Sequence, residues 1–123
     1  MEAIFSGHYA LIQFCPDLAR LEMLNVGLAV ISPLQKSSVV LGGRSAVVNT
    51  LIQNSTLREA GATLVIGGFI ERLRTALSKE PSLSVLSNFT FLGANPVSLS
   101  QVREVTIREI NSDAKRLLDR LVD

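Results

Sequence analysis

The chain has 123 residues, the length of one domain, and we expect a single domain over residues 1–123. Hydrophobic residues make up 47% and charged residues 19%, the formal net charge is +1, and there is one cysteine. This composition argues against a basic nucleic-acid-binding surface and excludes an intramolecular disulfide. The apolar surplus favours a deep core or a buried interface, so we expect a protein partner or a homodimer.

The first fourteen residues lack the features of a targeting segment. Glu2 stands where a signal peptide would carry basic residues, and polar residues interrupt the apolar ones that follow. The apolar runs are much shorter than the ~20 residues that a membrane-spanning helix needs. A single cysteine suits a reducing compartment, and we therefore expect a cytoplasmic protein without a membrane partner.

Three apolar stretches in the first third of the chain predict strands. They are His8–Phe14, followed by Pro16; Val26–Ser32, ended by Pro33; and Ser38–Leu41, closed by two glycines. Because the links between them are short, the strands should form an antiparallel meander.

The periodicity then changes to that of helices. A short helix is expected within residues 45–52. Apolar residues recur every three or four positions from Leu57 to Leu77 and predict one amphipathic helix that ends before Pro81. Gly61, Gly67 and Gly68 lie inside this pattern and mark either a break near Gly61 or Gly67 or close packing against the sheet.

The last third predicts further strands and a closing helix. Phe89–Leu92 alternates weakly, and the apolar residues between Val102 and Ile110 suggest an edge strand or an irregular arm. Asn111 or Ser112 should cap a helix over Asp113–Val122. The fold class is therefore α+β: an antiparallel sheet, with an N-terminal three-stranded meander plus one or two C-terminal strands, and helices on one face.

The residue types argue against metal and nucleophile chemistry. His8 and Cys15 are the only His and Cys, and they cannot complete a zinc site. Their separation of seven positions would point them to opposite faces of a strand, so a Cys–His dyad is disfavoured. No phosphate-binding or dinucleotide-binding glycine motif is present. The sequence therefore indicates no metal and no cofactor, and it favours a protein that is not an enzyme.

One polar cluster lies between the first two predicted strands. One interpretation is a turn held by an ion pair between Asp17 and Arg20 and by a hydrogen bond from Asn25. The other is a binding site for a partner or an anionic ligand, because loops held between strands often carry sites. The candidate residues are Asp17, Arg20, Glu22, Asn25, Arg44 and Tyr9.

The basic residues of the second half alternate with acidic ones. Arg72, Arg74, Lys79, Arg103 and Arg108 are interspersed with four glutamates, Glu71, Glu80, Glu104 and Glu109. This pattern is typical of a solvated surface with mixed charge, and it argues against nucleic acid as a partner.

The stretch YALIQFCPDLARLEMLNVGLAVISP, Tyr9–Pro33, resembles the N-terminal signature of a family of small bacterial proteins, the domain of unknown function 3037 family. The resemblance continues through FIERL at Phe69–Leu73 and DAKRLLDRLV at Asp113–Val122, although Leu21 stands where the family pattern has a small residue. No activity is assigned to this family. The resemblance implies genomic association with a kinase-like protein similar to the HipA toxins, and hence an accessory or regulatory role.

The leading functional hypothesis is a non-enzymatic protein–protein interaction or regulatory module in a toxin–antitoxin or defence operon. The alternative is a small enzyme or anionic-ligand-binding domain that uses the Asp17–Asn25 loop. In the first case a partner protein should bind the chain; in the second the loop side chains should converge on one pocket.

Overall fold

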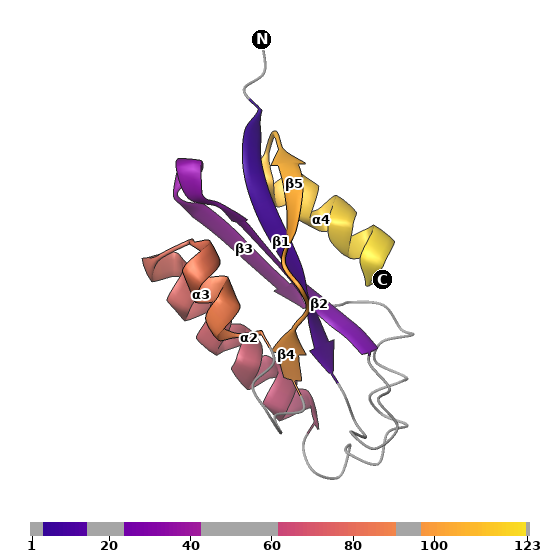
Figure 1. The fold of residues 1–123 in the computed structure, drawn as a ribbon. Helices are drawn as coiled ribbons and strands as arrows, with labels where there is room; N and C mark the ends of the chain where they lie inside the picture. Colours follow the sequence, from indigo (N-terminus) through magenta and orange to yellow (C-terminus); the bar gives the residue numbers. More distant parts are fainter. Residues whose placement is uncertain (1–3, 15–23, 43–61, 91–96, 123) are drawn as a thin grey trace.

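The computed structural model describes residues 4–14, 24–42, 62–90 and 97–122. The α+β class is confirmed (Figure 1): these residues form an antiparallel sheet and helices packed against it. The strands are β1 (Phe5–Phe14), β2 (Leu24–Ser32), β3 (Ser37–Gly42), β4 (Val97–Leu99) and β5 (Arg103–Ile107), and the helices are α2 (Ala62–Lys79), α3 (Leu83–Asn88) and α4 (Ile110–Leu121).

The N-terminal meander is confirmed. β1 pairs with β2 and β2 with β3, all antiparallel, and each strand extends a little beyond its predicted bounds. The turn between β2 and β3 is the 3-10 segment Pro33–Gln35, and Lys36 closes it in the left-handed region at φ 53°. The strand predicted between Val102 and Ile110 is β5, whereas β4 was not predicted; both β4 and β5 pair with β1.

β4 and β5 lie end to end along the same side of β1, with a one-residue bulge between them. Ile12 faces Leu99, whereas Tyr9 faces Arg103, so the outer strand uses one residue more than β1 over the same distance. Ser100 bridges the irregularity: its N–H donates to the Leu11 carbonyl (2.8 Å) and its hydroxyl accepts from the Leu11 N–H (2.9 Å).

The bulge changes the face to which the outer strand directs its apolar side chains. Because side chains alternate along a strand, one extra residue moves the following ones to the opposite face. Val97 and Leu99 therefore belong to the core under α2 and α3, and Ile107 belongs to the core under α4.

The helices cover both faces of the sheet, so the predicted placement on one face is wrong. Along β2, Ala29 and Ile31 pack with α2 and α3, while Leu28 and Val30 pack with α4. Figure 1 shows α2 and α3 on one side of the sheet and α4 on the other. An apolar strand without alternation is typical of a sheet buried on both sides. α4 needs such a surface because it buries Ala114 and Leu118.

This two-sided core accounts for the apolar surplus of the sequence. Within the described residues, the large hydrophobic side chains classed as exposed are Ile4, Leu34 and Leu83. Most of the others belong to the two clusters on either side of the sheet. Within the described residues the apolar side chains are therefore largely buried by the chain itself, and the expectation of a partner needs another observation to support it.

The long amphipathic helix is confirmed where it is described. α2 ends at Lys79, before Pro81, and buries Ile66, Phe69 and Leu73 against the sheet. The helix continues through Gly67 and Gly68 without a break, and a side chain at Gly67 would meet nothing within 4 Å. Close packing is thus not the reason for Gly67. The predicted helix at 45–52 lies outside the described residues.

Two predictions for the last third need correction. Residues 83–88 form the helix α3, which begins after Ser82; the Ser82 hydroxyl accepts from the Val85 N–H. Of the predicted strand Phe89–Leu92 the structure describes the first two residues, and Thr90 forms a single bridge to Leu99. α4 begins at Ile110 because the Glu109 carboxylate, rather than Asn111 or Ser112, accepts the free N–H groups of its first turn.

Candidate functional site

The structure describes two of the six predicted site residues. Asn25 lies on β2 and Tyr9 on β1. Asp17, Arg20, Glu22 and Arg44 lie outside the described residues, and so does Cys15.

Asn25 has a structural role. Its side-chain oxygen accepts from Gln13 Nε2 (3.1 Å), and its Nδ2 donates to the carbonyl of Leu121 (3.3 Å). The amide therefore joins β1, β2 and the last turn of α4, where backbone carbonyls lack partners within the helix. Both partners lie outside the Asp17–Asn25 turn, so these hydrogen bonds do not test the predicted turn, whose other members lie outside the described residues.

Tyr9 and Asn25 are not brought together. Tyr9 faces Val30 on β2 and Arg103 on β5, and its half-buried ring packs with the α4 cluster. Asn25 faces Gln13, four residues further along β1. At the rise of a strand these positions are roughly 13 Å apart.

The backbone groups of β5 alternate between pairing with β1 and pointing away from the sheet. Leu11 directs both its N–H and its carbonyl towards Ser100, on the side of β4 and β5. Backbone groups alternate in direction along an antiparallel strand, so Gly7 and Tyr9 direct theirs to Val105 and Arg103. By the same alternation, Glu104 and Thr106 direct their N–H and carbonyl groups away from the sheet.

The edge at β3 is guarded by an arginine from α2. The alternation carried across β2 directs the backbone groups of Val40 outward, and Arg74 Nη2 donates to the Val40 carbonyl (2.8 Å). Glu71 holds the same guanidinium through Nη1 (2.6 Å). This ion pair also explains why the basic residues of α2 do not form a purely cationic surface.

The edge at β4 is covered by the segment that follows α3. Leu99 directs its N–H outward to the carbonyl of Phe89 (2.9 Å), and Thr90 forms a bridge with Leu99. Phe89 also packs edge-on against Phe69 of α2, with ring centroids 5.6 Å apart. Within the described ranges, the outer side of β5 is the edge without such a cover, since β5 pairs with β1 alone.

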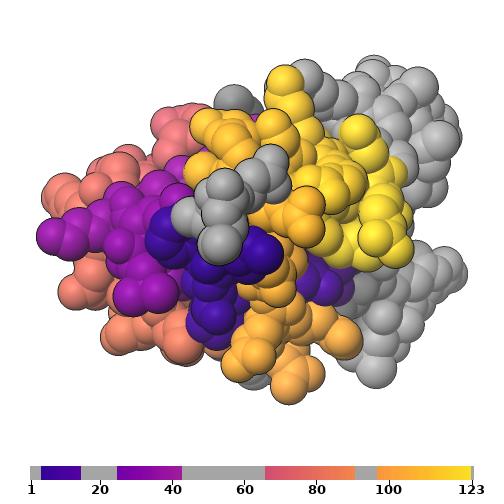
Figure 2. All heavy atoms as spheres, turned by 90° about the horizontal axis from the view of Figure 1, so that it is seen from above, coloured from indigo at the N-terminus to yellow at the C-terminus, as the bar shows by residue number. Residues whose placement is uncertain are grey.

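Two hollows flank β5, one on each face of the sheet. The hollow on the α4 side has a volume of about 170 Å³ and is lined by Val105, Thr106, Asp113, Arg116, Leu117 and Arg120. The hollow on the other face has a volume of about 360 Å³ and is lined by Ser6, His8, Glu104, Val105 and Thr106. In Figure 2 the orange β5 region and the yellow α4 lie side by side next to the start of β1.

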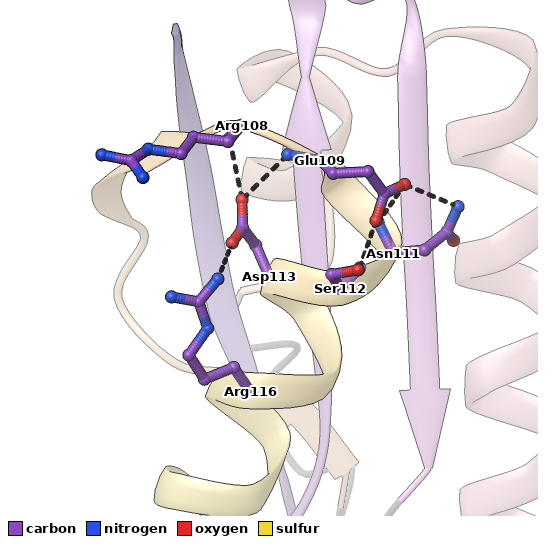
Figure 3. A network of polar contacts seen from close by, with 6 residues as sticks. All are labelled: Arg108, Glu109, Asn111, Ser112, Asp113 and Arg116. Carbon is purple, nitrogen blue, oxygen red and sulfur yellow. Dashed lines mark hydrogen bonds and ion pairs between the residues drawn. The ribbon is translucent and has the colours of Figure 1, made fainter. Parts of the chain in front are cut away.

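A polar network fixes the junction between β5 and α4 (Figure 3). Asp113, which is 8% exposed, accepts from the N–H groups of Arg108 (2.8 Å) and Glu109 (3.2 Å). Its other oxygen pairs with Arg116, whose side chain is 67% exposed. The network therefore holds Arg116 beside β5 while its guanidinium stays accessible to solvent.

The Glu109 carboxylate caps α4 and is stabilised in its charged form. It accepts from the backbone N–H groups of Ser112 (2.6 Å) and Asn111 (3.2 Å). The backbone hydrogen bond from Ser112 is the largest cause that lowers the pKa of Glu109 below its ordinary value. The carboxylate also lies at the helix N-terminus, where negative charge is favoured.

Among the described residues, no group of three or more His, Cys, Asp and Glu side chains could hold a metal ion. None of the described helices is both long and apolar enough to cross a membrane. The Nδ1 of His8 is buried and has no hydrogen-bond partner in the described part of the chain.

Comparisons with known proteins identify no relative. No family model, no curated protein and no solved structure matches the chain. The resemblance to the family of unknown function therefore remains an expectation.

The sequence contained part of the signal for this edge. Polar and apolar residues alternate over Glu104–Ile107, and the edge strand expected between Val102 and Ile110 is confirmed as β5. That β5 differs from the other edges was not predictable from the sequence, because the contacts at β3 and β4 come from Arg74 and Phe89, which lie on other parts of the chain.

Proposed function

We propose that this chain is a non-enzymatic protein-interaction module that binds an extended segment of a partner protein along the outer side of β5. The observation that carries the proposal is the contrast between β5, with its outward backbone groups, and the other edges, where Arg74 binds the Val40 carbonyl of β3 and Phe89 binds the Leu99 N–H of β4. Strand addition at an open edge is a common mode of peptide recognition, in which backbone hydrogen bonds provide affinity.

Natural proteins usually protect an edge strand that is not used, because it can pair with other chains. Here Arg74 contacts the outer side of β3, and Phe89 contacts the outer side of β4. The five residues of β5 lie between two hollows, which is the arrangement that alternating side chains of an added strand require. The Asp17–Asn25 alternative receives no comparable support, since the side-chain oxygen and nitrogen of Asn25 both form hydrogen bonds within the chain.

The cytoplasmic role in a toxin–antitoxin or defence operon is part of this proposal. The resemblance at Tyr9–Pro33 implies proximity to a HipA-like kinase. Such a kinase is the first partner to test, and its binding should depend on β5.

A proline pair tests the proposal. Thr106→Pro removes an outward N–H, so it should abolish strand addition while leaving the pairing with β1 intact. Val105→Pro removes an N–H directed to Gly7 and should instead destabilise the fold. The matched control is Thr106→Ala, which keeps the N–H.

Each variant is used as bait for the co-expressed kinase and, separately, for native-host lysate, and its folding is checked by thermal melting. A partner held by the native chain and by Thr106→Ala, and lost by a folded Thr106→Pro, supports the proposal. A partner bound equally by all three contradicts it.

A further inference from the structure

We infer that the segment bound at β5 carries acidic side chains at alternate positions, which enter the hollow between β5 and α4. This inference rests on the proposed function and names the chemistry of its partner. It is carried by the charges that line the two hollows.

The α4-side hollow has a positive charge balance. Its one carboxylate, Asp113, is occupied by two backbone N–H groups and by Arg116. Arg120 lines the same hollow and forms no ion pair with any described residue. A guanidinium recognises carboxylates through paired N–H donors, and Arg116 keeps donors that Asp113 does not use.

The hollow on the opposite face has a different chemistry. Ser6 faces Thr106 and His8 faces Glu104, so hydroxyl, imidazole and carboxylate groups line it. It should accept small polar or basic side chains. Because successive side chains of a strand point to opposite faces, an acidic residue entering the α4 hollow should be flanked by Ser, Thr or Lys.

A second copy of the chain fits this edge poorly. Antiparallel pairing of two β5 strands around Val105 would place both α4 helices on the same face of the joined sheet. Arg116 and Arg120 of one copy would then approach those of the other, and like charges would oppose the contact. An acidic segment of another protein satisfies the same arginines.

The experiment selects peptides from a random library displayed on phage against the full chain, with counter-selection on Thr106→Pro. We expect enriched sequences with Asp or Glu at every second position. Binding of a selected peptide, measured by fluorescence polarisation, should weaken about tenfold or more on Arg120→Glu. The control Lys115→Glu makes the same charge change on an exposed position of α4 that lines neither hollow, and it should have a much smaller effect.

The outcomes separate this inference from the proposed function. Peptides that need the Thr106 N–H but show no acidic bias, or that respond equally to Arg120→Glu and Lys115→Glu, would overturn the inference and leave strand addition in place. Selection of no peptide that depends on Thr106 would overturn both. A dimer seen by light scattering and lost in Thr106→Pro would assign the edge to a second copy instead.

Discussion

The two sides of the sheet differ in how their outward backbone groups are treated. At β3, Arg74 reaches from α2 to the Val40 carbonyl and is itself held by Glu71. At β5, Glu104 and Thr106 direct their backbone groups outward between two hollows. Because unprotected edges invite association, the proposed function assigns the partner to β5 rather than to β3.

The tightness of packing beside β5 and at β3 can be compared at two glycines, Gly7 of β1, which pairs with β5, and Gly42 of β3. A Cβ at Gly7 would lie 2.1 Å from Ile107 Cδ1 and 2.6 Å from the Ile31 carbonyl, whereas one at Gly42 would lie 3.4 Å from Ile70 Cδ1. We expect Gly7→Ala to lower the free energy of unfolding by about 3 kcal/mol, because backbone must move, and Gly42→Ala by less than about 1 kcal/mol. Urea unfolding measures both, and equal losses would contradict the packing at β5.

Ser100 joins the covered and the open parts of the outer strand. Ser100→Ala leaves the Leu11 N–H without its acceptor and should cost about 1–2 kcal/mol. Hydrogen exchange should show faster exchange at the Leu11 amide. Ser98→Ala is the control on the same strand, and it should leave that amide unchanged; a protected Leu11 in Ser100→Ala would refute the bridge.

Removing the Arg74 side chain tests whether it protects the edge at β3. Arg74→Ala frees the Val40 carbonyl and should lower stability by about 1 kcal/mol, a value reduced because the side chain is half exposed. It should also increase self-association in light scattering. Arg72→Ala removes the same charge from an exposed position of α2 and should do neither; identical behaviour of the two variants would show that Arg74 does not guard β3.

The smallest effect is expected at the cap of α4, beside the open edge. Because the pKa of Glu109 is lowered in the folded chain, its charge stabilises the fold at neutral pH, and this contribution is lost as the pH falls through the lowered pKa, below the ordinary value of 4.5. Glu109→Gln should therefore melt slightly below the native chain at neutral pH. The difference should disappear in acid, and a difference independent of pH would contradict the charge-based cap.

The candidate site shows how far local patterns reach. The apolar residues between Val102 and Ile110 predicted an edge strand or an irregular arm, and the polar Asn25 was expected to make a hydrogen bond. The partner of that bond, the Leu121 carbonyl, is distant in sequence and could not be inferred. Likewise, the hollow beside β5 combines residues from β5 and α4 whose side chains converge only after the chain turns between Ile107 and Ile110.

The sequence by itself determined the meander, the end of α2 before Pro81 and the amphipathic closing helix, because apolar periodicity and proline act over a few residues. Only the tertiary structure decided that α4 covers the second face and that β5 stays open within the described residues. A single bulge beside Ser100 redirects Ile107 to the α4 face, and one arginine protects β3. Both depend on contacts between residues that lie far apart in the chain, and a local pattern carries no record of them.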